Sequence, residues 1–142
     1  MAVKKKGPGW HGIDFDGTLA THGHVGWPEK LGEPIPKMVH RIQNWLENGE
    51  QVKILTARVF SGNLKREWER KRIERWCQEH IGRVLPGTSE KDQEMIDLYD
   101  DRARQIRRNT GELVASRIAA KAMNAGVRLA VRNIRKVSRS TP

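Results

Sequence analysis

The sequence predicts an α/β protein in which a parallel sheet carries helices on both faces. Two features lead to this prediction: short apolar runs have the length of strands, and longer stretches with apolar residues at helical spacing separate them. This alternation is typical of parallel sheets, because each helix returns the chain to the edge where the next strand begins. The predicted strands are residues 9–16, 51–55, 83–86 and 95–99. A chain of 142 residues is long enough to bury a core as one such domain.

Two helices are predicted between these strands. The first covers residues 34–48, with Pro36 in its first turn and Asn48-Gly49 at its end. Its apolar residues recur at helical spacing: Ile35, Met38, Val39, Ile42, Trp45 and Leu46. The second helix is predicted from about residue 62 to His80, with Ser61 as its cap. Its buried side is predicted to contain Trp68, Trp76, Cys77 and Ile81.

The net charge of +10 is concentrated near the C-terminus. Residues 1–101 contain 16 Lys or Arg and 16 Asp or Glu, whereas residues 102–142 contain 11 Lys or Arg and one acid. Since residues 112–136 also have loosely helical apolar spacing, we expect a domain of residues 1–111 followed by a basic helical extension, 112–142. Such an extension either binds a polyanion such as nucleic acid or stays solvated, and the sequence leaves both interpretations open.

The composition argues against secreted and membrane classes. Three lysines and Gly-Pro-Gly occupy the first ten residues, without the apolar run of a signal peptide. No stretch approaches the ~20 apolar residues of a membrane span. Cys77 is the only cysteine, so a disulfide within the chain is excluded. We therefore expect a cytoplasmic protein without membrane association.

Two acids follow the first predicted strand, within Asp14-Phe15-Asp16-Gly17-Thr18-Leu19. Residues two apart on a strand point the same way, so Asp14 and Asp16 can face one ligand while Phe15 packs into the core. Gly17 permits a sharp turn after the pair. Neighbouring carboxylates repel each other unless a cation lies between them, and Mg²⁺ prefers such oxygen ligands. The alternative is an Asp-Gly turn without any function.

Polar groups also end two other predicted strands. Thr56 follows residues 51–55, and Asp100 with Asp101 follows residues 95–99. In an open parallel sheet, ligands bind beyond the carboxyl ends of the strands. We therefore expect these groups to meet the first acid pair at one edge, although they are far apart in sequence. Thr56 as a plain strand end and Asp101 as a helix cap are the alternatives.

Taken in order, these residues resemble the motifs of the haloacid dehalogenase superfamily. Its first motif is similar to residues 14–19, and its second to Ile54-Leu55-Thr56-Ala57-Arg58. Lys91 resembles the third-motif lysine, and Asp100-Asp101 the fourth-motif acid pair. The resemblance covers residues 9–111 and implies a compact, Rossmann-like domain. The spacing from Lys91 to Asp100, followed by Arg102-Ala103, is similar to small members without a cap domain, which are often found in phages.

The resemblance implies a Mg²⁺-dependent phosphatase with Asp14, Asp16, Thr56 and Lys91 as catalytic residues. Asp14 would become an aspartyl-phosphate, and Asp16 would act first as acid and then as base. Thr56 would hold a phosphoryl oxygen through its hydroxyl and backbone N–H, and Lys91 would neutralise charge. Asp14, the backbone carbonyl of Asp16, and Asp100 would bind Mg²⁺. Arg58 is left without an assigned role.

The spacing of the motifs also bears on the phosphorylated substrate. Too few residues separate the motifs for a cap domain, which implies an open site that suits bulky substrates such as nucleic-acid ends. Trp27, in the loop beside the site, would either stack on a base or pack over the core edge. Two other functions stay open. One is a metabolite or mononucleotide phosphatase whose pocket a neighbouring subunit or the loop at 20–34 shapes. The other is a non-catalytic nucleic-acid-binding module that uses the basic tail.

Overall fold

The computed structural model describes residues 9–115 and separates two compact units, Met1–Ala103 and Arg104–Pro142. The sequence suggested a boundary after residue 111 instead. In the second unit, a turn at 107–110 brings Ile106 and Leu113 together in an isolated bridge, and Arg107 pairs with Glu112. The predicted basic helix lies almost wholly outside the described residues, and its first residues, 112–115, are not helical.

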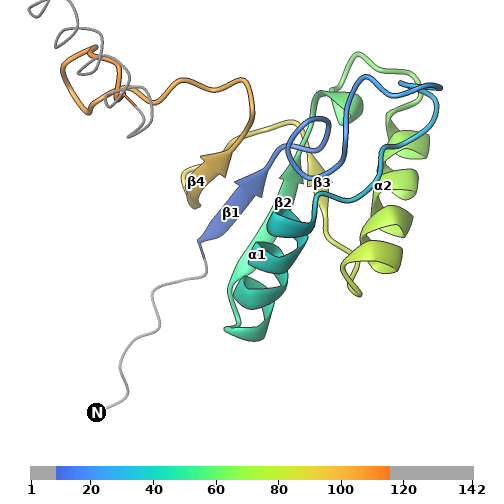
Figure 1. The fold of residues 1–142 in the computed structure, drawn as a ribbon. Helices are drawn as coiled ribbons and strands as arrows, with labels where there is room; N and C mark the ends of the chain where they lie inside the picture. The colour runs from blue at the N-terminus through green and yellow to red at the C-terminus, as the bar shows by residue number, and fades with distance from the viewer. Residues whose placement is uncertain (1–8, 116–142) are drawn as a thin grey trace, which may run out of the picture. The chain divides into compact units, whose positions relative to one another are not determined.

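A four-stranded parallel sheet forms the centre of the first unit (Figure 1). The strands are β1 (Trp10–Ile13), β2 (Gln51–Leu55), β3 (Gly87–Thr88) and β4 (Met95–Tyr99), in the spatial order β3-β2-β1-β4. The predicted α/β class with a parallel sheet is thus confirmed. The register aligns Ile13 of β1 with Ile54 of β2 and with Tyr99 of β4. These three strands therefore finish side by side, with β1 in the middle.

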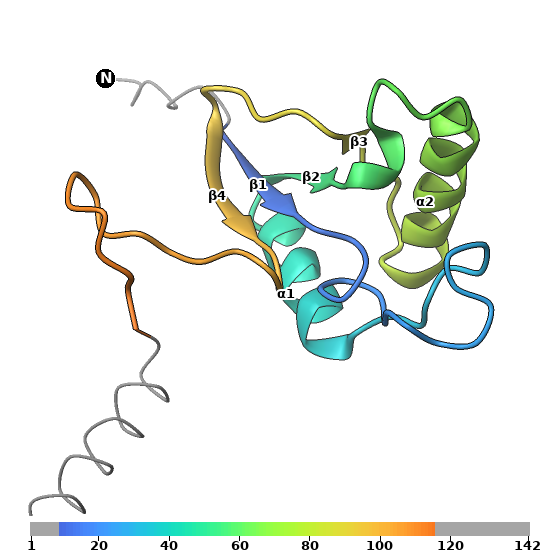
Figure 2. The same cartoon turned by 90° about the horizontal axis from the view of Figure 1, so that it is seen from above.

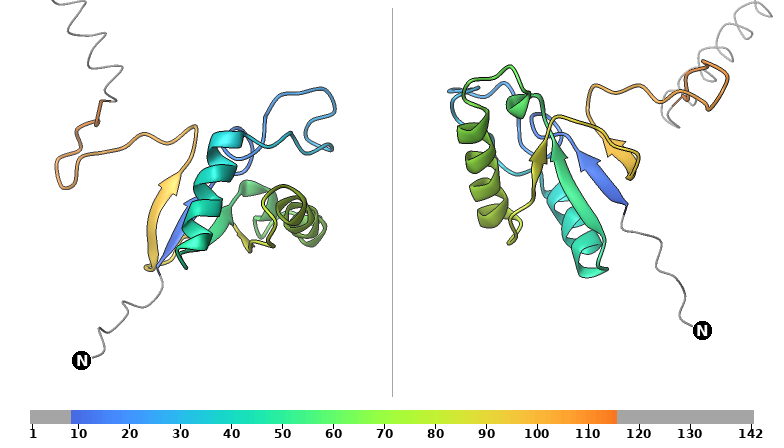
Figure 3. Two further views of the ribbon diagram at one scale, coloured as in Figure 1. Left: turned by 60° about the horizontal axis from the view of Figure 1, so that its bottom comes forward. Right: turned by 180° about the vertical axis from the view of Figure 1, so that it is seen from behind.

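Two helices connect the strands: α1 (Pro36–Glu47) joins β1 to β2, and α2 (Arg66–His80) joins β2 to β3. Ile42 of α1 and Ile73 of α2 belong to one core cluster with Ile54 of β2. Both helices therefore cover the same face of the sheet (Figures 2 and 3). The prediction of helices on both faces is thus wrong for residues 9–115. Both crossovers move in the same direction across the sheet, and right-handed crossovers then place their helices on one side.

On the opposite face of the sheet, the short segment 89–94, which links β3 to β4, places Asp92 against Trp10 and Lys53. Because His11 stacks on Trp45 of α1, the neighbouring Trp10 points away from the helices. Trp10 is nevertheless buried: its Nε1 donates to Asp92 Oδ1 at 2.8 Å, and the Lys53 ammonium lies 4.6 Å from its ring centre. A segment this short has no room for the helix that the sequence-based architecture requires on this face.

The strand predicted at residues 83–86 is wrong, because β3 begins at Gly87. The carbonyl of Pro86 does accept a hydrogen bond from the backbone of Ile54, so the chain reaches the sheet one residue earlier. Proline has no N–H to donate, and regular pairing starts beyond it.

The second helix also differs from its prediction. Trp68, expected on its buried side, is 52% exposed, whereas Trp76 and Cys77 are buried as predicted. Trp76 packs edge-on against Phe15, with ring centres 5.0 Å apart, and its Nε1 donates to the Gly32 carbonyl at 2.9 Å. α2 therefore holds both the turn after β1 and the following loop in place.

Candidate active site

The carboxyl end of β1 lies between those of β2 and β4. Asp14 follows β1 directly, and its backbone N–H donates to the Tyr99 carbonyl at 2.9 Å, which holds it against the end of β4. Asp100 comes immediately after β4, and Thr56 immediately after β2. The structure thus brings Asp14, Thr56 and Asp100 to one edge of the sheet, where parallel sheets bind their ligands.

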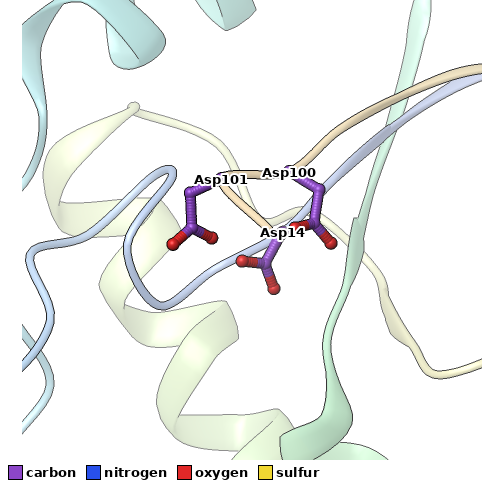
Figure 4. Close-up of side chains that lie close together, drawn as sticks. All are labelled: Asp14, Asp100 and Asp101. Carbon is purple, nitrogen blue, oxygen red and sulfur yellow. The ribbon is translucent and has the colours of Figure 1, made fainter. Parts of the chain in front are cut away.

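Asp14, Asp100 and Asp101 form an acid cluster (Figure 4), in which one carboxylate oxygen of each lies within 4.8 Å of the others. The Thr18 hydroxyl lies 3.3 Å from Asp14 Oδ2 and 3.2 Å from Asp101 Oδ1, and it accepts the Asp101 N–H at 2.9 Å. Its single hydrogen serves only one carboxylate at a time. The remaining oxygens are the hard ligands that Mg²⁺ prefers.

The acid cluster changes the titration of Asp14. Burial raises the pKa of Asp14, and the charge of Asp100 and a hydrogen bond with Asp101 raise it further, to about 7. Without a cation, the cluster therefore holds a proton close to neutral pH. A bound divalent cation removes the repulsion and releases this proton. The donors present thus fit Mg²⁺ in both their chemistry and their charge.

Gly17 is the residue that allows the acids to come together. Its φ is +88°, a conformation that favours glycine, and its N–H donates to the Ala20 carbonyl at 2.8 Å. A Cβ at this position would lie 2.6 Å from Asp101 Oδ2. Any side chain here would therefore collide with the acid cluster as well as strain the turn.

The side chain of Asp16 lies outside the acid cluster and faces Arg58 instead. Arg58 donates from Nε to Oδ2 at 2.7 Å and from Nη2 to Oδ1 at 2.8 Å, a bidentate contact, and Trp27 Nε1 donates to Oδ1 at 3.1 Å. Burial alone would raise the pKa of Asp16, but the hydrogen bonds and charge of Arg58 outweigh burial and lower it. The two side chains of the pair therefore separate. Asp101, and not the Asp16 carboxylate, completes the cluster.

Arg58 is itself held from two further directions. Its Nη1 donates to the Pro28 carbonyl at 2.9 Å and lies 3.4 Å from Glu69 Oε2. The side chains of Arg58 and Glu69 are only 9% and 12% exposed. The sequence singled out neither role: Arg58 had no assignment, and nothing distinguishes Glu69 from the other glutamates of a charged helix.

Thr56 and Lys91 occupy different surroundings. Thr56 is buried at the site, and its Oγ1 accepts the Arg58 N–H at 3.2 Å. Its own N–H donates to the Thr88 carbonyl at 2.9 Å, so of the two groups expected to hold a phosphoryl oxygen only the hydroxyl remains. Lys91 is exposed in the 89–94 segment and does not line the cavity at the site, whereas Ser89 does.

These groups line a cavity of about 1030 Å³. Its wall includes the acid cluster, Asp16, Thr56 and Arg58, together with ring-bearing side chains and one further cation. The remaining principal lining residues are His22, Trp27, Pro28, Phe60, Asn63, Glu69 and Arg102.

Within residues 9–115, no helix combines the length and the apolar character needed to cross a membrane. In comparisons with known proteins, no family model matches the chain, and neither a curated protein nor a solved structure matches it.

Proposed function

We propose that this chain is a Mg²⁺-dependent phosphomonoester hydrolase of the haloacid dehalogenase type, with Asp14 as the residue that is transiently phosphorylated. The acid cluster is the observation that carries the proposal. Three carboxylates at the end of the central strand repel one another, so their arrangement is unfavourable without a cation. The order of the motifs along the sequence supports the same reaction type.

In this reaction Asp14 attacks the phosphorus atom, and the bond from phosphorus to the leaving oxygen breaks as the bond to Asp14 forms. Asp16 gives a proton to the leaving oxygen. A water molecule then returns a proton to Asp16 and attacks the phosphorus, which releases inorganic phosphate and regenerates Asp14. Mg²⁺ held by Asp14, Asp100 and Asp101 supplies positive charge against the phosphate when it is bound.

Arg58 keeps Asp16 in the ionised form with which a base begins. The same contact lowers the pKa of Asp16 and so weakens its affinity for a proton, which makes orientation of the carboxylate the main contribution of Arg58. To act as an acid in the first step, Asp16 has to gain a proton. The negative charge of the incoming phosphate raises the pKa of Asp16 and so favours this protonation. The bidentate contact fixes the direction in which Asp16 presents its oxygens.

A second cation is needed to balance the substrate phosphate. The resemblance assigns this part to Lys91, but Lys91 does not line the cavity, whereas Arg102 lines it in addition to Arg58. On our proposal Arg102 contacts the phosphate, and the support for Lys91 comes from the motif order alone.

The proposal is tested by hydrolysis of p-nitrophenyl phosphate with Mg²⁺ and with a chelator. Turnover should require Mg²⁺, and Asp14→Asn should reduce it to background, because an amide is a poor nucleophile and a weak metal ligand. Glu90→Gln is the matched control, since Glu90 is exposed and outside the cavity, and it should keep the wild-type rate. Wild-type activity in Asp14→Asn would refute the covalent mechanism.

The charge distribution favours a second candidate, a nucleic-acid-binding module without catalysis, because the entire net charge lies in residues 102–142. Oligonucleotide binding without hydrolysis of any phosphomonoester would support this candidate. A metabolite phosphatase with a pocket shaped by an oligomer is the alternative enzyme, and faster turnover of sugar phosphates than of nucleotides would identify it.

A further inference from the structure

The cavity at the acid cluster is much larger than a phosphate group requires. Its volume of about 1030 Å³ is at the upper end of ordinary small-molecule sites, which are ~300–1,000 Å³. The acids occupy only part of the wall. The group that carries the phosphate has to lie against the rest, so the chemistry of that part of the wall indicates the substrate.

Four side chains with rings line this part of the wall. Trp27 is 40% exposed and Phe60 is 52% exposed, and both line the same cavity together with Pro28 and the imidazole of His22. Single exposed apolar side chains are ordinary, but two large aromatic residues in one cavity with a phosphate-binding chemistry indicate a site for a flat, apolar group.

The Trp27 ring and the backbone at Phe60 are also held in place before any ligand binds. Trp27 is anchored by its hydrogen bond to Asp16, and His22 packs on it edge-to-face, with ring centres 4.5 Å apart. Phe60 lies in a tight turn in which its carbonyl accepts the Asn63 N–H at 3.0 Å. A ring that is already ordered, as that of Trp27 is, loses little entropy on binding, which favours recognition by stacking.

The polar groups of this wall are mostly engaged by other parts of the protein. Arg58 holds Asp16 and Glu69, and Asn63 donates to the Arg58 carbonyl at 2.6 Å and accepts the Lys65 N–H at 3.0 Å. A polyhydroxylated leaving group would exchange hydrogen bonds with water for contact with rings, which is unfavourable. The face of a nucleobase has no such hydrogen bonds to lose.

We propose that Trp27 and Phe60 form a base-binding subsite, so that the substrate is a phosphomonoester that carries a nucleobase. The base belongs either to a free nucleotide or to the end of a nucleic acid, since both present the same flat ring. This inference rests on the proposed function and names its substrate class. Removing one stacked base typically weakens binding roughly fivefold to a hundredfold.

The experiment compares kcat/KM for adenosine 5′-monophosphate with that for ribose 5-phosphate, which lacks only the base. The wild-type protein should prefer the nucleotide, and Phe60→Ala should lower the ratio of the two values at least about fivefold. Leu64→Ala is the matched control, because Leu64 is fully exposed in the same loop but does not line the cavity, and it should leave the ratio unchanged.

Trp27 needs a pair of variants because its N–H also contacts Asp16. Trp27→Phe and Trp27→Leu both remove that hydrogen bond, but only Trp27→Leu removes the ring. The preference for the nucleotide should therefore survive in Trp27→Phe and fall in Trp27→Leu. A terminally phosphorylated oligonucleotide is tested as a third substrate. A higher kcat/KM for it than for the mononucleotide identifies a nucleic-acid end as the substrate, and a lower value identifies a free nucleotide.

Three outcomes overturn the inference: equal kcat/KM with and without the base, a ratio that neither Phe60→Ala nor Trp27→Leu changes, or a preference for phosphotyrosine. Calorimetric titration of Asp14→Asn with both ligands separates the inference from the proposed function. Base-dependent binding without wild-type hydrolysis keeps the subsite and refutes the phosphatase. Hydrolysis without base dependence keeps the phosphatase and refutes the subsite.

Discussion

At the scale of single residues, Arg58 connects the turn after β1, the loop at 21–33 and α2. Its guanidinium makes a bidentate contact with Asp16, reaches the Pro28 carbonyl and lies beside Glu69. None of these partners belongs to the acid cluster. A change at Arg58 should therefore affect the proposed acid–base step separately from the proposed metal binding.

We expect Arg58→Ala to lower kcat by about 10²–10⁴, the usual contribution of a positioned acid–base group. Arg58→Lys should be intermediate, because it keeps the charge but not the bidentate contact. The Mg²⁺ affinity, measured by calorimetry, should stay unchanged in both, and added guanidinium should restore part of the activity of Arg58→Ala. Arg75→Ala, at an exposed position of α2, is the control. An unchanged kcat in Arg58→Ala would assign the role to another group.

The raised pKa of Asp14 predicts how Mg²⁺ and pH together affect the stability of the protein. Its pKa is about 7 in the folded protein and 3.8 as the reference value, so the folded protein binds this proton more tightly. Without Mg²⁺, the stability contributed by Asp14 therefore decreases as the pH rises from about 4 to about 7. If Mg²⁺ binds at the acid cluster as proposed, it removes this decrease by pairing with the ionised carboxylates.

The increase in Tm caused by Mg²⁺ should thus be small at about pH 5.5 and larger by several degrees at about pH 8. Thermal unfolding with and without Mg²⁺ measures it. Asp14→Asn should unfold at a higher temperature than the wild type without Mg²⁺ at about pH 8, because the amide carries no charge. An equal effect of Mg²⁺ at both values of pH would contradict metal binding at the acid cluster.

At the scale of elements, His11 of β1 connects neighbouring elements at the amino end of the sheet. Its Nδ1 lies 2.7 Å from Asp97 of β4, its Nε2 lies 3.0 Å from Glu50 just before β2, and its ring stacks on Trp45 of α1 at 4.2 Å. Burial alone would lower the pKa of His11, but the hydrogen bonds with Asp97 and Glu50 outweigh burial and raise it. The imidazole of β1 thus contacts β4, the residue before β2 and α1.

Because the folded-state pKa of His11 is raised, its contribution to stability is full below about 6.5 and disappears as the pH rises through the folded-state value. We expect His11→Gln to lower the free energy of unfolding by about 1–3 kcal/mol at about pH 6, and by less at about pH 9. Urea unfolding of the wild type and of His11→Gln at both pH values measures the difference in free energy of unfolding. His40→Gln, at an exposed position of α1, should have no such effect. A destabilisation that grows with pH would show that His11 acts as a neutral packing residue.

The elements that the sequence predicted well are those with a strong local pattern. α1 and the residue before it carry six apolar residues at helical spacing, and β2 and β4 are short, mainly apolar runs with clear ends. β3 was misplaced because it is a two-residue edge strand that depends on pairing with β2, and local composition carries no sign of it. The same limit applies at the site. The spacing of Asp14 and Asp16 indicated shared direction, but the Gly17 turn and the distant Arg58 direct the two carboxylates to different partners.

At the scale of the whole molecule, the chain combines a unit whose acidic and basic groups nearly balance with a strongly basic unit. Residues 1–101 carry equal numbers of acidic and basic groups, and the excess of ten positive charges lies in residues 102–142. The boundary between the compact units, after Ala103, almost coincides with this change in charge. The acid cluster therefore lies in one unit and nine of the ten excess positive charges lie in the other, so the proposed hydrolysis and the proposed nucleic-acid binding are separable by experiment.

If the basic unit binds nucleic acid, the affinity for an oligonucleotide should fall steeply with salt, because neutralised phosphates release their counterions. The slope of log K against log salt should be about −0.9 per phosphate contact on duplex and about −0.7 on single strands. Replacing Arg128, Arg132, Arg135 and Lys136 by Gln should make this slope shallower in proportion to the number of phosphates that these side chains neutralise, while hydrolysis of p-nitrophenyl phosphate persists. A chain that ends at Gly111 should stay folded and no longer show the salt-sensitive binding. If that shorter chain unfolds or changes its oligomeric state, the tail is structural. If the full-length protein binds no oligonucleotide even at low salt, the basic charge serves solvation, and a small phosphorylated metabolite becomes the preferred substrate.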